Sequence, residues 1–154
     1  MNKVIIISLG PHCKSAERRK RKYNLYRPTY NTCCFDLMIS NLEGIIKCFK
    51  DDFKEFCNTK YLVYDKQCIK NSYYNFHFNH ETPGHANLHL SERWPGRNKY
   101  YFTENKFQMF IKRYNRRIQN LQNYIHDYNY IILIFEKLKS DEEKKKLLLQ
   151  LYNI

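Results

Sequence analysis

The feature that most constrains the fold is a run of β-branched residues near the start of the chain, Val4-Ile5-Ile6-Ile7 within residues 3–9. Its residues are all apolar, without the apolar–polar alternation of a strand that is exposed on one face. The run is therefore typical of a strand buried on both faces, as in a parallel sheet. A second run of this kind, residues 131–135, comes far along the chain. We therefore expect two neighbouring strands in one sheet with helices on its faces.

Segments of helical and strand-like pattern alternate between and around these two runs. We expect helices over residues 14–23, 40–49, 51–56 and 104–128 and from Ser140 onward, and short strands over 61–64 and 73–78. Residues 79–100 contain Pro83-Gly84 and Pro95-Gly96, which predict a long loop. This order favours an α/β fold, with a mostly parallel or mixed central sheet and helices on both faces.

The length of 154 residues corresponds to one domain, which we expect to span residues 1–154. Neither apolar run approaches the ~20 residues needed to cross a bilayer, so no membrane insertion is expected. Gly10-Pro11 interrupts the first run too early for a signal peptide. These features predict a cytoplasmic protein whose six cysteines are free thiols.

The chain is strongly basic, with 27 Lys and Arg against 15 Asp and Glu and a net charge of +12. Such a surface attracts polyanions, but no nucleic-acid recognition motif accompanies it. An AT-rich coding sequence would produce part of this bias without functional selection. We therefore expect at most weak polyanion binding, for which the basic residues of 18–22 and 112–117 would have to converge on one face.

The segment 104–128 has its apolar residues three and four positions apart, which predicts one apolar helix face. These residues are Phe107, Phe110, Ile111, Tyr114, Ile118, Leu121 and Ile125. The opposite side is expected to carry the basic residues Lys112, Arg113, Arg116 and Arg117.

Cys13 is the cysteine with the most reactive local setting. It follows the first predicted strand and Gly10-Pro11, at the start of the expected basic helix. Helix N-termini and nearby cations stabilise a thiolate. The alternative is a buried cysteine in an ordinary strand–helix turn.

A second group of candidate residues is the histidine cluster at positions 77, 80, 85 and 89. His80, beside Glu81 at the end of a predicted strand, is placed to act as a general base. A zinc site formed by these histidines, serving a metal-dependent hydrolase, is an alternative, although positions 77 and 80 of a strand would point to opposite faces. We expect no metal and no other cofactor.

An ordered set of short motifs over about residues 4–137 resembles the uncharacterised family of papain-like cysteine peptidases. Each motif has a counterpart in that family: Ser8-Leu9-Gly10-Pro11-His12-Cys13, Phe35-Asp36, Asp52-Phe53, Phe76-His77-Phe78-Asn79-His80-Glu81, Arg116-Arg117 and Ile134-Phe135-Glu136-Lys137. Four family positions are substituted here, at Cys34, Leu37, Glu81 and Lys137. The chain stops soon after the last predicted helix, so it is expected to lack a C-terminal part of the family's domain.

The resemblance implies a thiol hydrolase, that is, a thiol protease or a related enzyme acting on a peptide or acyl substrate. Cys13 would be the nucleophile and His80 the general base, with Asp36 or Glu81 as candidate third catalytic residues. Arg116-Arg117 would contribute to binding. Papain-like enzymes have no buried strand directly before the cysteine, so an α+β papain-like fold is the alternative to α/β. The alternative function is a catalytically inactive basic protein that binds nucleic acid or an acidic partner.

Overall fold

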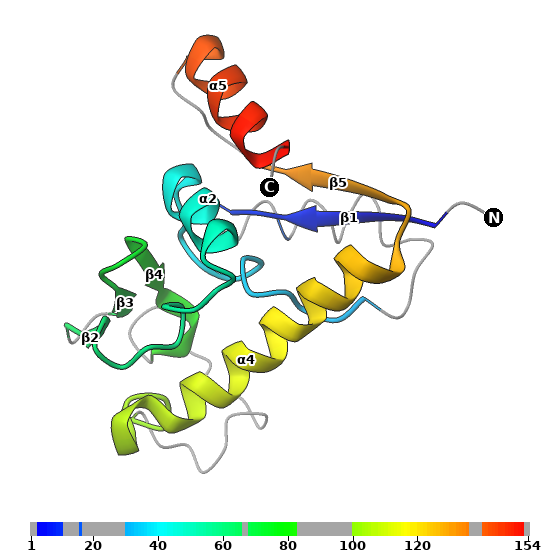
Figure 1. The fold of residues 1–154 in the computed structure, drawn as a ribbon. Helices are drawn as coiled ribbons and strands as arrows, with labels where there is room; N and C mark the ends of the chain where they lie inside the picture. The colour runs from blue at the N-terminus through cyan, green and yellow to red at the C-terminus, as the bar shows by residue number, and fades with distance from the viewer. Residues whose placement is uncertain are drawn as a thin grey trace.

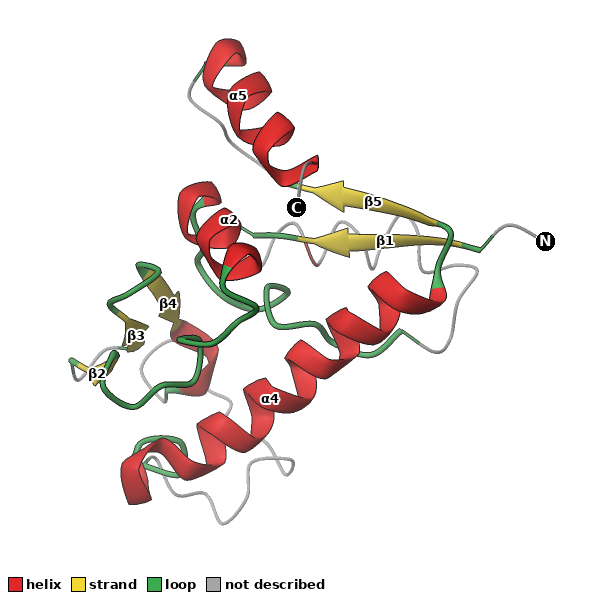
Figure 2. Ribbon diagram, in the orientation of Figure 1, coloured by secondary structure: helices red, strands yellow, loops and turns green. Residues whose placement is uncertain are grey.

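The structure is a computed structural model that describes residues 3–10, 16, 30–65, 68–82, 100–135 and 140–152. The fold is mixed α/β (Figure 1; Figure 2). In chain order the elements are β1 (Val4–Ser8), α2 (Leu42–Lys50), β2 (Leu62–Tyr64), β3 (Ile69–Asn71), β4 (Phe76–Phe78), the 3-10 helix η2 (Asn79–Glu81), α4 (Glu104–Asp127), β5 (Tyr130–Ile134) and α5 (Asp141–Tyr152). The helix expected over 14–23 and the loop expected over 79–100 fall largely outside the described residues.

The two apolar runs pair with each other as parallel strands, as expected. Ile5 lies opposite Ile131 and Ile7 opposite Leu133, and the pairing runs the full length of β1 and β5 (Figure 1). The backbone N–H of Leu9 extends it by donating to the carbonyl of Ile134 at 2.9 Å. The prediction that these strands are sheet neighbours is confirmed.

The remaining described strands form a separate antiparallel sheet in the order β2-β3-β4. The described strands thus make two small sheets, where one central sheet was expected. The reason is local: only four residues separate β2 from β3 and β3 from β4, and strands joined by such short connections pair antiparallel. The strand expected over 73–78 begins only at Phe76, because the turn before it holds Asn75 at a φ of 57°.

The second apolar run is more exposed than its composition predicts. Ile7 in β1 is fully buried, whereas Tyr130 and Ile132 in β5 are 55% and 49% exposed. The expectation of two equally buried strands is therefore wrong for β5. A continuous apolar run shows that a strand tolerates burial on both faces, but it does not show that other elements cover both faces.

One hydrophobic core joins β1, α2, the antiparallel sheet and α4. The ring of Phe56 lies near its centre, with ring centroids 5.6–5.7 Å from those of Phe76, Phe78 and Tyr114. The short helix expected over 51–56 is instead a series of turns, because Asp52 and Phe53 take positive φ values of 51° and 61°. These turns place Phe56 in the core.

Helix α2 begins at Leu42, two residues after the start of the range expected for it. Asn41 is its N-cap, and its side-chain oxygen accepts a hydrogen bond from the N–H of Gly44 at 2.7 Å.

Helix α4 covers nearly the predicted range, but Asn105, Lys106 and Phe107 take positive φ values of 49°, 54° and 64°, so the regular right-handed helix begins only after Phe107. Its polar side also differs from expectation. Arg117 is buried, at 6% exposure, while Ile125 is 43% exposed. The assignment of all four basic residues to a solvent-facing side is therefore wrong for Arg117, which has a buried partner.

Within the described part of the chain, no helix has both the length and the apolar character required to cross a bilayer.

Candidate functional site

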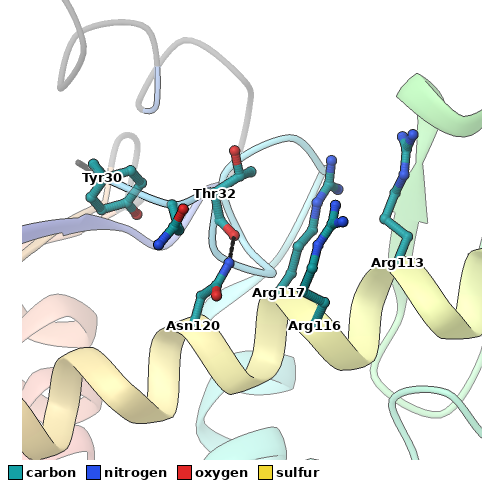
Figure 3. A pocket seen from close by; sticks show the side chains of 7 residues that line it. Tyr30, Thr32, Arg113, Arg116, Arg117 and Asn120 are labelled. Carbon is teal, nitrogen blue, oxygen red and sulfur yellow. Dashed lines mark hydrogen bonds between the residues drawn. The ribbon is translucent and has the colours of Figure 1, made fainter. Parts of the chain in front are cut away.

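A polar cavity lies between the middle of α4 and the segment 30–32. Its volume is about 470 Å³, and its lining residues are Tyr30, Asn31, Thr32, Arg113, Arg116, Arg117 and Asn120. The four residues from α4 are spaced three and four apart, which places them on one side of the helix. Figure 3 shows the three arginine side chains leaving α4 in the same direction.

The wall opposite α4 is held in place by side chains of that helix. Asn120 Nδ2 donates to the carbonyl of Thr32 at 2.9 Å (Figure 3), and the Tyr124 hydroxyl accepts from the N–H of Asn31. Tyr30 stacks on Tyr124 with ring centroids 5.2 Å apart. The segment 30–32 is therefore fixed against α4 at several points, which gives the cavity a defined shape.

Asp36 holds the segment 30–33 through hydrogen bonds. Its buried carboxylate accepts from the N–H of Cys33 at 2.7 Å and from the hydroxyl of Tyr30 at 3.0 Å. These contacts clamp the loop, a common use of aspartate in turns. The role of Asp36 as a third catalytic residue stays a prediction.

Glu81 forms ion pairs with two of the three arginines that line the cavity. Its side chain has no solvent exposure, and Oε1 lies 3.2 Å from Nη1 of Arg117 and 3.4 Å from Nη1 of Arg113. Its other oxygen, Oε2, and the buried Tyr114 hydroxyl make no hydrogen bond of good geometry to a described residue. One buried carboxylate therefore holds two guanidinium groups at the cavity. Its use as a catalytic acid also stays a prediction.

Aromatic rings complete the surroundings of these arginines. The guanidinium of Arg113 lies 4.2 Å from the ring centroid of Phe102, and that of Arg117 lies 4.8 Å from that of Tyr114. Cation–π contacts at partly desolvated sites are favourable and orient the guanidinium. Arg116 differs from both, because it is exposed and has no acidic partner among the described residues.

The electrostatics of the cluster follow from this arrangement. Burial lowers the pKa of Arg117, but its electrostatic interactions, first with Tyr114 and then with Glu81 and Asp36, outweigh burial, so its pKa lies above the ordinary value. Burial lowers the pKa of Arg113, and Glu81 offsets only part of this effect. Burial, followed by the charge of Glu81, raises the pKa of the Tyr114 hydroxyl. Arginine remains charged at any physiological pH, so the cavity keeps its positive charge.

The predicted base, His80, lies in η2 beside Glu81 and is partly buried. Backbone hydrogen bonds connect this region to the end of β1. His77, three residues before His80, exchanges two of them with Ile39, at 2.8 and 2.9 Å. The next residue, Ser40, donates from its hydroxyl to the carbonyl of Leu9 at 2.6 Å. The segment leading to Cys13 and the segment carrying His80 thus converge on residues 39–40.

The predicted nucleophile, Cys13, lies outside the described residues, as do His85 and His89. The described cysteines form a contrasting group. Burial raises the pKa of Cys34 and Cys48, raises that of Cys57 to about 12, and is the main cause of a raised pKa at Cys68. Cys33 is fully buried. None of these pKa values favours a thiolate near neutral pH.

His77 and His80 do not combine into a metal site with other described residues. Across the described ranges, no group of three His, Cys, Asp or Glu side chains is placed to hold a metal ion. His80 lies beyond the end of β4, in η2, so the two histidines are not on one continuous strand.

Sequence reasoning selected Arg116 and Arg117 as binding residues, and both line the cavity. It did not select Arg113. The available signal was its spacing, because Arg113 precedes Arg117 by four positions and Arg116 by three, which puts all three on one side of a helix.

Comparison with protein-family models, with curated proteins and with solved structures finds no match to this chain. The resemblance to papain-like cysteine peptidases therefore stays a prediction from the motifs.

Proposed function

We propose that this protein is a thiol hydrolase in which Cys13 is the nucleophile and His80 the general base. The observation that carries the proposal is the convergence at residues 39–40. Ser40 binds the carbonyl of Leu9, at the end of β1, while Ile39 pairs with His77, just before His80. These contacts link the segment that precedes Cys13 with the segment that precedes His80, which supports the proposed pair.

The reach of the chain is compatible with such a pair. Cys13 follows Gly10 by three residues, and His80 follows His77 by three residues. Three residues span at most about 11 Å, so the chain length permits Cys13 and His80 to meet near residues 39–40. In sheets with parallel strands, ligands bind beyond the carboxyl ends of the strands, which is where β1 leads to Cys13.

The reaction consists of two acyl transfers. His80 takes the proton of the Cys13 thiol, the thiolate attacks the substrate carbonyl, and His80 returns the proton to the leaving group. Water, deprotonated by His80, then attacks the thioester and releases the acid, and the proton returns to the thiolate. A peptide or another acyl compound satisfies this chemistry.

The proposal is tested by alkylation with iodoacetamide at pH 6. The raised pKa values of Cys34, Cys48, Cys57 and Cys68 keep those thiols protonated, so Cys13 is expected to be labelled first. Replacing His80 with Ala should slow the labelling of Cys13 at least roughly tenfold, because the thiolate loses its ion-pair partner. Peptide mapping by mass spectrometry identifies the labelled cysteine.

His77→Gln is the matched control, because His77 lies three residues away on β4 and is also partly buried. It should leave the labelling rate of Cys13 unchanged. Equal labelling of all six cysteines, or a rate that is indifferent to His80→Ala, would contradict the thiol hydrolase.

A second candidate function is a catalytically inactive protein that binds nucleic acid or an acidic partner. The cavity favours this function, because three arginine side chains from one side of α4 line it. The substitutions at Cys34, Leu37, Glu81 and Lys137 are also compatible with lost catalysis. Polyanion binding should then weaken steeply with salt, as the release of counterions requires. The other basic cluster, residues 18–22, lies outside the described residues.

The proposal includes an α/β or papain-like α+β fold and a cytoplasmic location. The parallel pairing of β1 and β5 supports a mostly parallel or mixed α/β sheet with helices on both faces. The separate antiparallel sheet supports the α+β papain-like alternative. Cys34, Cys48, Cys57 and Cys68 are free thiols, which supports a reducing compartment such as the cytoplasm.

A further inference from the structure

The arginine cavity adjoins a second, smaller pocket. The second pocket has a volume of about 250 Å³, and its lining residues are Tyr101, Phe102, Met109, Lys112, Arg113 and Arg116. Arg113 and Arg116 therefore line both spaces. The first space is walled mainly by polar groups, whereas the second has two aromatic rings and a methionine among its walls.

In the part of the chain that the structure describes, the carboxylates near the first pocket do not balance its positive charges. Arg113, Arg116 and Arg117 bring three positive charges, and the nearby carboxylates are those of Glu81 and Asp36. Both carboxylates are buried, and neither lines the cavity. The exposed guanidinium of Arg116 has no acidic partner in the described part of the chain. The planar, forked donors of arginine match the oxygens of phosphate or carboxylate.

We infer that the two pockets together bind one ligand that joins an oxyanion to an aromatic or apolar group. The oxyanion, a phosphate or a carboxylate, lies among Arg113, Arg116 and Arg117. The aromatic or apolar group lies against Phe102 and Met109. The combined space is typical of a small-molecule site, in which a few polar groups fix orientation and apolar walls supply contact area.

This ligand class goes beyond the proposed hydrolase and differs from the polyanion of the second candidate. A polyanion gains affinity from many surface charges and is released by salt. The ligand inferred here gains affinity from both halves of one small molecule. Among the described residues, His80 lines neither pocket, and the binding test does not use the Cys13 thiol. The two proposals can therefore fail independently.

Isothermal titration calorimetry on the full chain tests the inference with four probes: phenyl phosphate, inorganic phosphate, benzoate and phenol. Phenyl phosphate or benzoate should bind at least tenfold more tightly than inorganic phosphate and phenol, because only the first two occupy both pockets. The tighter of the two identifies the oxyanion. If neither exceeds inorganic phosphate, the second pocket makes no contribution and the inference is overturned.

Two variants separate this site from general surface charge. Arg116→Gln removes the unpaired guanidinium and should weaken binding of the tighter probe at least tenfold. Lys54→Gln makes the same change of charge at an exposed position that lines neither pocket, and should change the affinity less than twofold. Equal losses in the two variants would show that net charge alone attracts the probe and would overturn the inference.

A third variant tests the apolar half. Met109→Ala should reduce the affinity for the tighter aromatic probe while leaving that for inorganic phosphate unchanged, because Met109 lines only the second pocket. Unchanged affinity for the aromatic probe would contradict a shared ligand. None of these titrations involves the Cys13 thiol, so failure of the labelling experiment and failure of this one are distinguishable.

Discussion

The burial of charged and apolar side chains follows opposite patterns in the α4–η2 region and in the β1–β5 pair. In the first, charged residues are buried: Glu81 has no solvent exposure and Arg117 is 6% exposed. In the second, apolar residues are exposed: Ile132 is 49% exposed and Tyr130 55%. Burial in this protein is therefore decided by what lies opposite each residue as much as by its own polarity.

The physical reasons differ between the two regions. A buried charge is tolerated only when it is paired and hydrogen-bonded, and Glu81 provides that pairing for Arg117 and Arg113. An exposed apolar side chain carries no comparable penalty. Ile132 therefore stays exposed beside its parallel partner in β1. Buried charges impose strict requirements on their neighbours, whereas exposed apolar residues impose few.

The largest expected effect comes from breaking the buried ion cluster. Glu81→Ala leaves Arg117 buried without its carboxylate, and such uncompensated charges cost about 3–5 kcal/mol of unfolding free energy. Urea denaturation followed by circular dichroism measures the loss. The exposed Glu43, in the first turn of α2, is the control, because Glu43→Ala removes the same type of side chain and should cost less than about 1 kcal/mol. Equal costs would contradict a structural role for the cluster.

A smaller effect is expected from truncations within the parallel pair. Ile7→Ala removes a fully buried side chain and should cost about 2–5 kcal/mol, whereas Ile132→Ala, at a half-exposed position, should cost less than about 1 kcal/mol. Both positions lie in paired strands and lose the same atoms, so the difference reports burial alone. Urea denaturation of both variants measures it. A cost for Ile132→Ala close to that for Ile7→Ala would show that β5 is covered in solution.

Much of the fold was predictable because it depends on local pattern. The 3.6-residue period predicted the main part of α4, and the helix expected over 40–49 overlaps most of α2. The β-branched composition of β1 and β5 predicted their pairing. The turns at 51–56 were not predicted, since the positive φ of Asp52 and Phe53 breaks a helix that their sequence would permit. The short strand β3 is too brief to show a period.

The candidate site was less predictable, because it depends on contacts between distant segments. Arg116 and Arg117 could be selected as a pair, but the pairing of Arg117 with Glu81 joins residues 36 positions apart. Helical spacing alone placed Arg117 among exposed residues. Similarly, the contact of Ser40 with Leu9 gives no signal in the sequence. Polar pairs of this kind become visible only when the tertiary neighbours are known.

The smallest expected effect concerns His77, which faces Lys70 across β3 and β4. Burial, and then the charge of Lys70, lowers the pKa of His77 below 6.5, although Asp65 acts in the opposite direction. The native state therefore binds fewer protons than the unfolded state, and stability should fall as pH drops below about 6.5. Since His77 is partly exposed, the contribution is small. Urea denaturation between pH 8 and pH 5 should show a shallower loss of stability for His77→Gln than for the parent chain. Parallel curves for the two proteins would show that His77 has the same pKa in the native and the unfolded state. The polar residues of this sheet would then lack the strict pairing seen around Glu81.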